Sequence, residues 1–241
     1  GPGCVINIDK FLEEIRILNE AGFDTSLVKV SPNAHIITEE HIKYDKEHLG
    51  HLGTTAQGIA PCYSDKMLRR GRRAIEMMDS QWIWDGKLEG KILCEGAQSV
   101  WLDIDHGDYP YVTSSTTMPY GACSLGIPPR KVNRVIGVAK AYDTKSGVDP
   151  LFPETLWKNP LLNAIIDEGG EYGSTTGRKR LVNWLNLDKL MAAIKLSACT
   201  ELVINKCDIL EKVGIYKVFY KGELKDFYNL KEMKAFVNDA L

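Results

Sequence analysis

Residues 187–205 read LDKLMAAIKLSACTELVIN. This stretch predicts a helix over 187–197, followed by an apolar strand over 201–205. The polar sequence Asn205-Lys206-Cys207-Asp208 comes directly after the strand. Apolar strands that alternate with helices and end in polar or glycine loops indicate an α/β fold, in which ligands bind at the carboxyl ends of the strands.

The same alternation extends outward along the chain. Apolar strands are expected over Val132–Ala141 and Lys91–Glu95. The other predicted elements are a helix that Asp9 caps, a strand over Ser26–Val30, helices over 38–50, Asp65–Met78 and Leu230–Leu241, and a β-ribbon that starts near Tyr216. We therefore predict a single α/β domain over residues 1–241, with a largely parallel central sheet and flanking helices. The loops after Cys94, after Ile204 and around Gly173 should converge at one edge of that sheet.

Composition and charge exclude several classes of protein. With 44% hydrophobic and 26% charged residues, the chain has the composition of a soluble globular protein. Its formal net charge of -2 provides no bulk attraction to nucleic acid or to an anionic membrane, so any anion binding must be local. No apolar run approaches the roughly 20 residues that span a bilayer, and the N-terminus lacks the pattern of a signal peptide. The six cysteines form no Cys-x-x-Cys pair, which predicts reduced thiols and a cytoplasmic location.

The segment from Gly169 to Arg180 has the composition of an anion-binding loop. It holds four glycines, three serine or threonine hydroxyls and three cations within twelve positions, which core packing does not explain. Backbone N–H groups, hydroxyls and guanidinium groups are the donors that hold carboxylates and phosphates. The alternative is a flexible surface loop with incidental charge.

Two segments nearer the N-terminus have related compositions. The sequence Gly53-Thr54-Thr55-Ala56-Gln57-Gly58 offers glycines that allow close backbone approach and threonines that can donate to a phosphate. By itself, this pattern also fits a solvated turn. The basic run that follows holds five cations within residues 66–73, and it fits either a solvated helix face or a phosphate site built from arginines.

A polar cluster follows the strand expected over Lys91–Glu95. Gln98 and the hydroxyl groups around Thr113 suit hydrogen bonding to the edge of a base or ribose. The acids Asp103 and Asp105, with the neighbouring histidine, suggest a metal site, but no second set of ligands is visible. We therefore expect a structural hydrogen-bond network here, and we assign no metal ligand in this chain.

The tetrad Asn205-Lys206-Cys207-Asp208 fits a guanine site. The carboxylate of Asp208 can accept hydrogen bonds from the ring N1–H and the exocyclic amine, while the stem of Lys206 packs over the ring. The pattern is short, and its position directly after an apolar strand strengthens it.

Taken in order, these segments resemble the adenylosuccinate synthetase family over nearly the whole chain. The pattern Gly-Thr-Thr-x-x-Gly-Ile-x-Pro-x-Tyr-x-Asp-Lys-x-x-Arg-x-Gly-x-Arg is met from Gly53 to Arg73. The other matching segments are Glu95–Ser115, Val135–Tyr142, Phe152–Thr155, Gly173–Trp184 and Lys206-x-Asp208. The resemblance implies a fold similar to that of P-loop NTPases, of which this chain would hold an incomplete form.

The resemblance also implies a reaction. The family joins L-aspartate to inosine monophosphate (IMP), with GTP and Mg²⁺: the γ-phosphoryl group is placed on the purine O6, and the aspartate amine then displaces it. The residues implied to hold the nucleoside monophosphate are Thr54, Thr55, Arg69, Gln98, Thr113 and Arg178. Those implied to hold aspartate are Ser174, Thr175, Thr176, Gly177 and Arg178, and those implied to hold GTP are Arg180, Lys206, Cys207 and Asp208. Gln98 is also the implied catalytic residue, and Arg69 is implied to act from the partner subunit of a homodimer.

Departures from the family pattern leave alternatives open. The family's N-terminal glycine loop, which carries the catalytic aspartate, a phosphate-binding lysine and a Mg²⁺ contact, has no match here, and neither does the C-terminal part of the guanine pocket. Ala56-Gln57 replaces the usual Gly-Arg, and Lys145 stands where an arginine is common. The segment between Arg73 and Glu95 is short, as in compact archaeal forms and in phage relatives that use dGMP to make aminoadenylosuccinate.

Three hypotheses follow: an enzyme that acts on IMP, a phage-type enzyme that acts on dGMP with GTP or ATP as donor, and a non-catalytic nucleotide-binding module. We expect negligible turnover from residues 1–241 alone, because phosphoryl transfer needs the lysine and the metal site of the unmatched loop.

Overall fold

The structure is a computed structural model that describes residues 1–147, 149, 152, 156, 159–174 and 176–241. Its contacts divide the chain into an N-terminal unit, Gly1–Val132, and a C-terminal unit, Asn133–Leu241, and each has its own hydrophobic core. The single domain expected over residues 1–241 stays a prediction. Thr175 and most of the Phe152–Thr155 turn lie outside the described residues.

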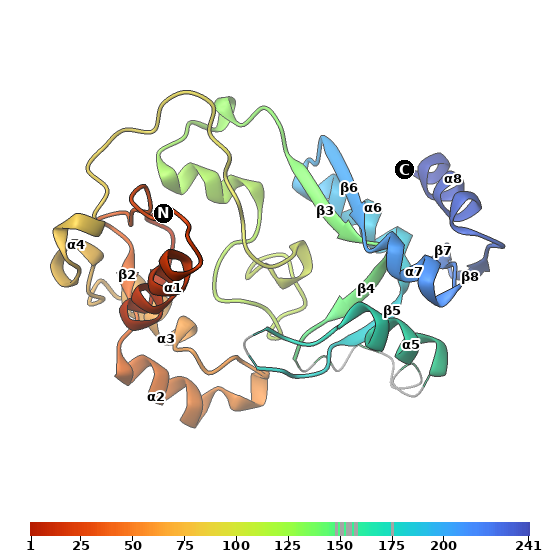
Figure 1. Cartoon of the computed structure of the whole chain (residues 1–241), viewed down its shortest axis with the longest axis horizontal. Helices are drawn as coiled ribbons and strands as arrows, with labels where there is room; N and C mark the ends of the chain where they lie inside the picture. Colours follow the sequence, from red (N-terminus) through yellow and green to blue (C-terminus); the bar gives the residue numbers. More distant parts are fainter. Residues whose placement is uncertain (148, 150–151, 153–155, 157–158, 175) are drawn as a thin grey trace. The chain divides into compact units, whose positions relative to one another are not determined.

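The N-terminal unit surrounds a small core with short helices and one pair of parallel strands (Figure 1). Strand β1 (Val5–Ile6) pairs with β2 (His35–Ile36), and Ile36 is buried together with Val30, Ala34 and Ala74. The α-helices are α1 (Ile8–Glu20), α2 (Glu39–His48), α3 (Ile59–Met67) and α4 (Ala74–Met77). The 3-10 helices are η1 (Gly50–Leu52), η2 (Ser80–Trp82), η3 (Val100–Leu102), η4 (Pro119–Leu125) and η5 (Pro129–Lys131).

The start of this unit confirms one predicted element and corrects another. Helix α1 is present, but its cap is Asn7, whose side chain accepts a backbone hydrogen bond at 3.0 Å, and not Asp9. The strand predicted over Ser26–Val30 is wrong. Asp24 accepts a hydrogen bond from the N–H of Ser26 at 2.9 Å within a turn, and only Val30 makes an isolated β-bridge.

The basic helix predicted over Asp65–Met78 is wrong. Helix α3 ends at Met67, and Arg69 has φ +62°, a left-handed conformation that reverses the chain. The N–H groups of Arg70 and Gly71 both donate to the carbonyl oxygen of Asp65, at 3.0 and 3.1 Å. The cations of this segment therefore lie around a turn and not along one helix face.

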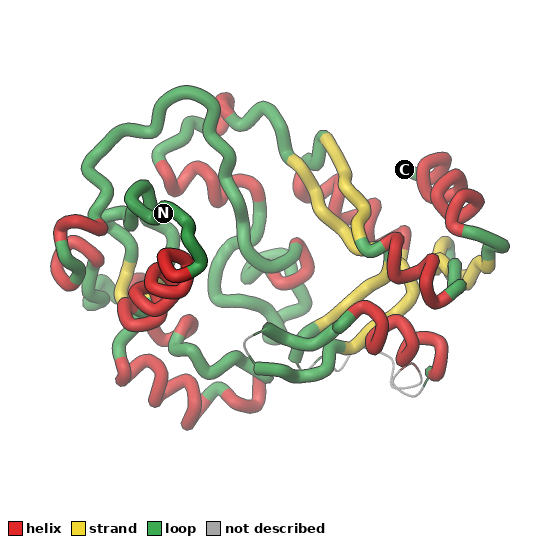
Figure 2. The backbone as a smooth tube through the Cα atoms, viewed as in Figure 1, coloured by secondary structure: helices red, strands yellow, loops and turns green. Residues whose placement is uncertain are grey.

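The strand predicted over Lys91–Glu95 is also wrong. Its residues are exposed and pair with no described strand, because an apolar run of three residues buries too little surface to hold an isolated strand in place. Figure 2 draws most of the chain between Met78 and Val132 as loop. The helix expected over 38–50 is confirmed as α2.

The C-terminal unit confirms the α/β fold class. Strand β3 (Ile136–Lys140) pairs in parallel with β6 (Glu201–Asn205), and a second sheet has the strand order β4-β5-β7-β8. In that second sheet, β5 and β7 are parallel, whereas the β4–β5 and β7–β8 pairs are antiparallel. The strands are β4 (Tyr142–Lys145), β5 (Leu181–Asn186), β7 (Lys217–Tyr220) and β8 (Glu223–Asp226). The helices are α5 (Pro160–Gly169), α6 (Leu187–Ser197), α7 (Cys207–Val213) and α8 (Leu230–Ala240).

Helix α6 and strand β6 have the bounds that residues 187–205 predict. Asn186 caps α6 by accepting from the N–H of Lys189 at 3.0 Å, and Ala198, with φ +51°, ends it. The ribbon and helix expected in the tail are confirmed as β7, β8 and α8. The core of the unit includes the fully buried side chains Leu162, Ile165, Leu187 and Val218.

The parallel pairing of β3 and β6 determines where the candidate site lies. Lys140 is opposite Asn205, so the two strands end at the same edge (Figure 1). Helix α5 packs against α7 and β5, which brings further polar residues close to this edge.

Two expectations from composition can be compared with the structure. Among the described residues, no helix is both long enough and apolar enough to cross a membrane. The six cysteines are unpaired in the structure, and their reduced state stays a prediction.

Candidate functional site

The carboxyl end of β6 lies beside the C-terminus of α5. Lys206 has φ +61° and turns the chain from β6 into α7. Its Nζ donates to the carbonyl oxygen of Gly169, the last residue of α5, at 3.1 Å. A cation is favourable there because the C-terminal end of a helix carries a partial negative charge. The loop after Ile204 thus meets the start of the segment around Gly173, as expected. The expected approach of the loop after Cys94, which belongs to the other unit, stays a prediction.

Glu171 is the buried centre of this site. Only 1% of the residue is exposed, and its carboxylate accepts hydrogen bonds from Lys140 Nζ at 2.7 Å, Tyr142 OH at 2.7 Å and Arg180 NH1 at 2.8 Å. Burial opposes ionisation, but these donors outweigh it and hold the pKa of Glu171 below its ordinary value. Burial also lowers the pKa of Lys140, against the opposing effect of Glu171.

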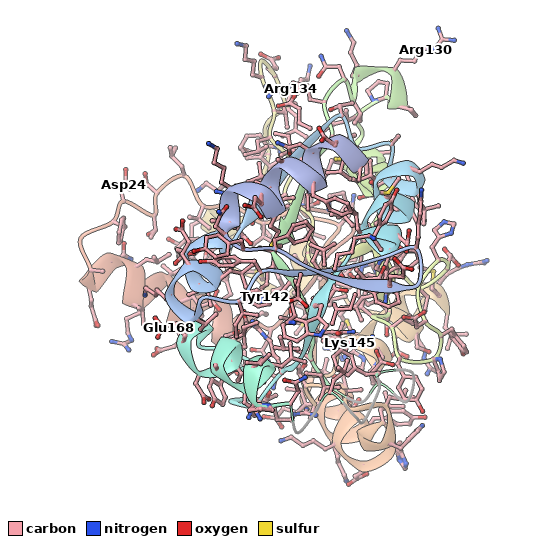
Figure 3. All side chains as sticks on the ribbon, turned by 90° about the vertical axis from the view of Figure 1, so that its right-hand side faces the viewer. Asp24, Arg130, Arg134, Tyr142, Lys145 and Glu168 are labelled. Atoms are coloured by element: carbon pink, nitrogen blue, oxygen red, sulfur yellow. The ribbon has the colours of Figure 1, made fainter. Side chains whose placement is uncertain are left out.

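A glycine lets Tyr142 reach this carboxylate. A Cβ atom at Gly169 would lie 2.7 Å from the Tyr142 hydroxyl, so a larger residue would displace the ring. Burial, together with the hydrogen bond and the charge of Glu171, raises the pKa of Tyr142 far above its ordinary value. Figure 3 marks Tyr142 among the side chains inside this unit and Glu168 near its edge.

The predicted anion-binding loop is the end of a short hairpin. The N–H of Arg180 donates to the carbonyl oxygen of Glu171 at 2.9 Å, and Tyr172 and Lys179 form a bridge one step further out. The N–H of Gly173 then donates to the carbonyl oxygen of Arg178 at 2.8 Å. The elements that flank the hairpin are α5 and β5, so the base of the loop is fixed to the core.

Some of the donors expected to bind an anion are used inside the loop. The N–H groups of Gly173 and Gly177 both donate to carbonyl oxygens of the loop itself, and Gly177 needs its left-handed φ of +64° to close the turn. Ser174, Thr176 and Arg178 are exposed, so their side chains face solvent. Anion binding by this loop stays a prediction, and it rests on side chains more than on these two backbone groups.

The residues predicted to hold guanine lie directly after β6. Asp208 is exposed in the first turn of α7, and Cys207 is half-buried with its Sγ 3.8 Å from the carbonyl oxygen of Ile204. Lys206, Cys207 and Asp208 therefore lie directly after the carboxyl end of β6, which is where ligands bind in α/β sheets.

In the N-terminal unit, the loop after η1 is organised by a buried acid. Asp45 is 2% exposed and accepts from the Thr54 hydroxyl at 2.7 Å and from the N–H of Gly58 at 2.8 Å. The Thr54 oxygen in turn accepts from the N–H of Ala56 at 3.2 Å. The Thr54 hydroxyl therefore donates inside the protein, whereas Thr55 is exposed.

Arg69 projects from the turn that follows α3. Asp65 pairs with Arg70, whose Nε lies 2.8 Å from its carboxylate, and this hydrogen bond lowers the pKa of Asp65. Arg69 itself is exposed, and no carboxylate of the described residues pairs with its guanidinium group. Its backbone has a left-handed φ of +62° in this turn.

The acid cluster around Asp103 is a structural network, as predicted. Its buried carboxylate accepts hydrogen bonds from the N–H groups of Asp105, His106 and Thr117 at 2.7 to 3.1 Å. Burial raises the pKa of Asp103, but these hydrogen bonds outweigh that effect and hold the pKa below its ordinary value. Among the described residues, no three acidic, histidine or cysteine side chains come together as metal ligands.

Two of the residues predicted to bind the nucleotide lie in loops beside this network. Gln98 is exposed with φ +64°, and the N–H of Thr113 donates to the carbonyl oxygen of Leu102 at 2.8 Å.

The sequence analysis missed two buried acids: Asp45, which holds the loop at 53–58, and Glu171, which holds the loop at 173–178. Glu171 is the single acid among the glycines and cations of residues 169–180, and that contrast is a usable signal. Asp45 has no such signal, because it lies in a polar helix among other charged residues.

Comparison with known proteins agrees with this geometry. The family model described as adenylosuccinate synthetase matches residues 1–90 and 80–234. The adenylosuccinate synthetase of Thermodesulfovibrio yellowstonii is 34% identical over 90% of this chain and 64% of its own length, and that of Helicobacter hepaticus is 34% identical over 94% and 68%. The chain thus spans about two thirds of the length of these relatives.

Two solved structures have a similar fold. The fully ligated adenylosuccinate synthetase from Plasmodium falciparum matches with a TM-score of 0.75 and 25% identity, over 97% of this chain and 70% of its own. The succinoaminodeoxyadenylate synthetase of cyanophage S-2L, bound to dGMP and dATP, matches with a TM-score of 0.65 and 18% identity, over 100% and 79%, which is a likeness of fold alone. The chain belongs to the adenylosuccinate synthetase family.

Proposed function

We propose that this chain serves purine nucleotide biosynthesis as a ligase that joins L-aspartate to IMP, with GTP as the phosphoryl donor. Family membership supports the proposal. The observation that carries it is the cluster of Lys206, Arg180 and the Gly173–Arg178 loop beside the carboxyl ends of two parallel strands.

The chemistry assigns a task to each part of this cluster. Arg180 neutralises phosphate oxygens of GTP, and Lys206 with Asp208 recognises the guanine, while Cys207 lies beside it. The γ-phosphoryl group passes to the purine O6, which then leaves as phosphate when the aspartate amine attacks C6. The aspartate carboxylates are held by Ser174, Thr175, Thr176 and Arg178, and the part of Gly177 is to close the turn that carries them, because its N–H donates to the carbonyl oxygen of Gly173. Arginine suits position 178 because its planar fork pairs with carboxylates in bidentate fashion.

The residues proposed for the nucleoside monophosphate are Thr54, Thr55, Arg69, Gln98, Thr113 and Arg178. Because the Thr54 hydroxyl donates to Asp45, its part is to shape the loop that presents Thr55. Gln98 is the proposed catalytic amide, and the exposed Arg69 is proposed to reach a phosphate in the partner subunit of a homodimer.

Mg²⁺ is part of the proposed reaction, where it neutralises phosphate charge. The described residues hold no cluster of acidic, histidine or cysteine side chains that fits the ion, so we propose no ligand for it in this chain. A cytoplasmic location is proposed with the same enzyme.

A second candidate is ligation of aspartate to dGMP. The fold likeness to the cyanophage enzyme, which is bound to dGMP, and the unusual Ala56-Gln57 pair support this alternative. A substrate panel decides between the two. The natural protein that contains residues 1–241 is incubated with aspartate, Mg²⁺ and either IMP or dGMP, with GTP or ATP. We expect product from IMP and GTP, and turnover of dGMP but not IMP would overturn the first proposal.

The same panel with residues 1–241 alone tests the third hypothesis, a non-catalytic nucleotide-binding module. We expect GTP binding with negligible turnover from these residues alone.

A further inference from the structure

We infer that Glu171 is a positioning residue for the anion site: its carboxylate fixes Arg180 and, with it, the loop that Arg180 closes. The inference rests on the proposed function and adds a residue to which that function assigns no part. An acid beside Lys140, Arg180 and Lys206 offsets one of three cations, which weakens attraction for a phosphate-bearing ligand.

Lys140 is the counter-ion that makes the buried acid stable. Its three ammonium protons are used by the two Glu171 oxygens, both at 2.7 Å, and by the Thr144 hydroxyl at 3.2 Å. No proton is left for a ligand, and the Lys140 side chain is only 24% exposed. Lys140 therefore serves Glu171 and does not bind the anion itself.

Arg180 is in a different position. Its guanidinium group gives one hydrogen bond to Glu171, at 2.8 Å, and its remaining N–H donors have no partner among the described residues. The side chain is 29% exposed, so these donors can reach a ligand. The hydrogen bond to Glu171 restricts the rotamers of a long side chain, which lowers the entropy that Arg180 loses when it binds phosphate.

Glu171 holds the backbone of the hairpin as well as its cation. Its carbonyl oxygen accepts from the N–H of Arg180 at 2.9 Å, and the Gly173–Arg178 loop begins two residues later. Tyr142, at the start of β4, holds the same carboxylate from the core side at 2.7 Å. A displaced Glu171 would therefore move Arg180 and the loop together.

The ligand class that fits is a polyphosphate, as carried by a nucleoside triphosphate. The probes are inorganic tripolyphosphate and GTP, and the readout is the dissociation constant for residues 1–241 by titration calorimetry. Glu171→Asp retains the charge but shortens the side chain by one methylene. Glu171→Gln removes the charge but retains the length. Glu168→Asp, on an exposed acid of α5, is the matched control.

We expect Glu171→Asp to weaken binding of both probes at least fivefold and Glu168→Asp to leave it unchanged. Tyr142→Phe, which removes one hydrogen bond to Glu171 and no charge, should weaken binding about twofold to fivefold. If Glu171→Asp does not fold, Tyr142→Phe tests the inference in its place. A purely electrostatic role predicts the opposite pattern, with tighter binding by Glu171→Gln and no change in Glu171→Asp. That pattern would overturn the inference, and so would a lower Tm with unchanged affinity.

The substrate panel separates this result from the proposed function. Binding of tripolyphosphate that depends on Glu171, without turnover of IMP or dGMP, supports the inference and removes the proposed ligase. Turnover that is unaffected by Glu171→Asp in the natural protein supports the ligase and removes the inference. Failure of unmodified residues 1–241 to bind either probe also overturns the inference.

Discussion

Two loops of this chain have similar compositions and are built differently. The loop at 53–58 and the loop at 173–178 are both rich in glycine and threonine, and each is anchored by a buried acid. Asp45 holds the first through a hydroxyl and a backbone N–H, which are neutral donors. Glu171 holds the second through two cations and a phenol.

The acid in the first loop holds only neutral donors and determines the shape of the loop, whereas the acid in the second loop also holds cations. In the first loop, the internal acid takes up donors that composition alone would assign to a phosphate. In the second loop, the internal acid leaves Arg180 with donors to spare. Only the second arrangement concentrates positive charge near a strand end, which is where the ligands of an α/β fold bind.

The largest expected loss of stability follows from removing Glu171, the acid that holds two cations. Glu171→Ala leaves Lys140 partly buried without its counter-ion, and it should cost about 3–5 kcal/mol of unfolding free energy. Urea denaturation measures this value. Glu168→Ala, which removes an exposed partner of Lys212, is the control and should not change stability measurably. Equal losses in the two variants would contradict the central position of Glu171.

The pH dependence of Glu171 has a definite sign. Its pKa is lowered in the folded protein, so its contribution is fully present above the unfolded value of 4.5. It is lost as the pH falls through the lower folded value.

A half-buried acid that accepts no hydrogen bond from a cation among the described residues should behave in the opposite way. Burial raises the pKa of Asp143 from 3.8 to about 6, and the hydrogen bond from the Asn186 N–H and the charge of Lys189 offset this only in part. The folded protein then binds the proton more tightly than the unfolded chain does, so stability rises as the pH falls from about 7 to about 4. Asp143→Asn should remove this slope and stabilise the protein at pH 7 by about 2 kcal/mol.

Thermal or urea unfolding across pH checks the prediction for Asp143. Asp239→Asn, on an exposed acid of α8, is the control and should leave the slope unchanged. A destabilised Asp143→Asn at pH 7 would show that the charged form is favoured by its surroundings.

A smaller loss of stability is expected at Asp45, the acid that holds only neutral donors. Thr54→Val removes the hydroxyl that donates to Asp45 and leaves one buried carboxylate oxygen without this partner. We expect a loss of about 1–2 kcal/mol. Thr55→Val, at the exposed neighbour, is the matched control and should be neutral. A larger loss in Thr55→Val would reverse the assignment of roles within this loop.

The smallest effect should come from an exposed ion pair. Arg134 makes two hydrogen bonds to Glu201, at 2.6 and 2.7 Å, where β3 and β6 begin, but both side chains are largely solvent-exposed. Such pairs are screened by salt and contribute little. Arg134→Met should leave the Tm unchanged within error at 0.15 M salt. A clear loss of Tm that persists at high salt would contradict this.

The fold could be predicted where local pattern and packing agree. Residues 187–205 have both a capped helix and an apolar strand, and the structure confirms their bounds. The strands expected over Ser26–Val30 and Lys91–Glu95 failed, because a strand needs a partner whose position a local pattern does not contain. The basic helix failed at Arg69, whose left-handed φ is unusual for a non-glycine residue.

The candidate site could be predicted as a set of segments, but not as a set of contacts. The position of the loops after predicted strands led us to expect that the loop after Ile204 meets the segment around Gly173, and Lys206 does contact the carbonyl oxygen of Gly169. The bonds from Tyr142 and Lys140 to Glu171 join residues about thirty positions apart, and only the pairing of strands brings them together.

The Gly173–Arg178 loop is proposed to bind the amino-acid substrate. The most direct test is the steady-state kinetics of Arg178→Ala in the natural protein that contains this chain. Loss of the guanidinium group should raise the aspartate KM at least tenfold and leave the KM for GTP nearly unchanged, since a charge-assisted hydrogen bond contributes about 1.5–3 kcal/mol. An unchanged aspartate KM and kcat would contradict the claim.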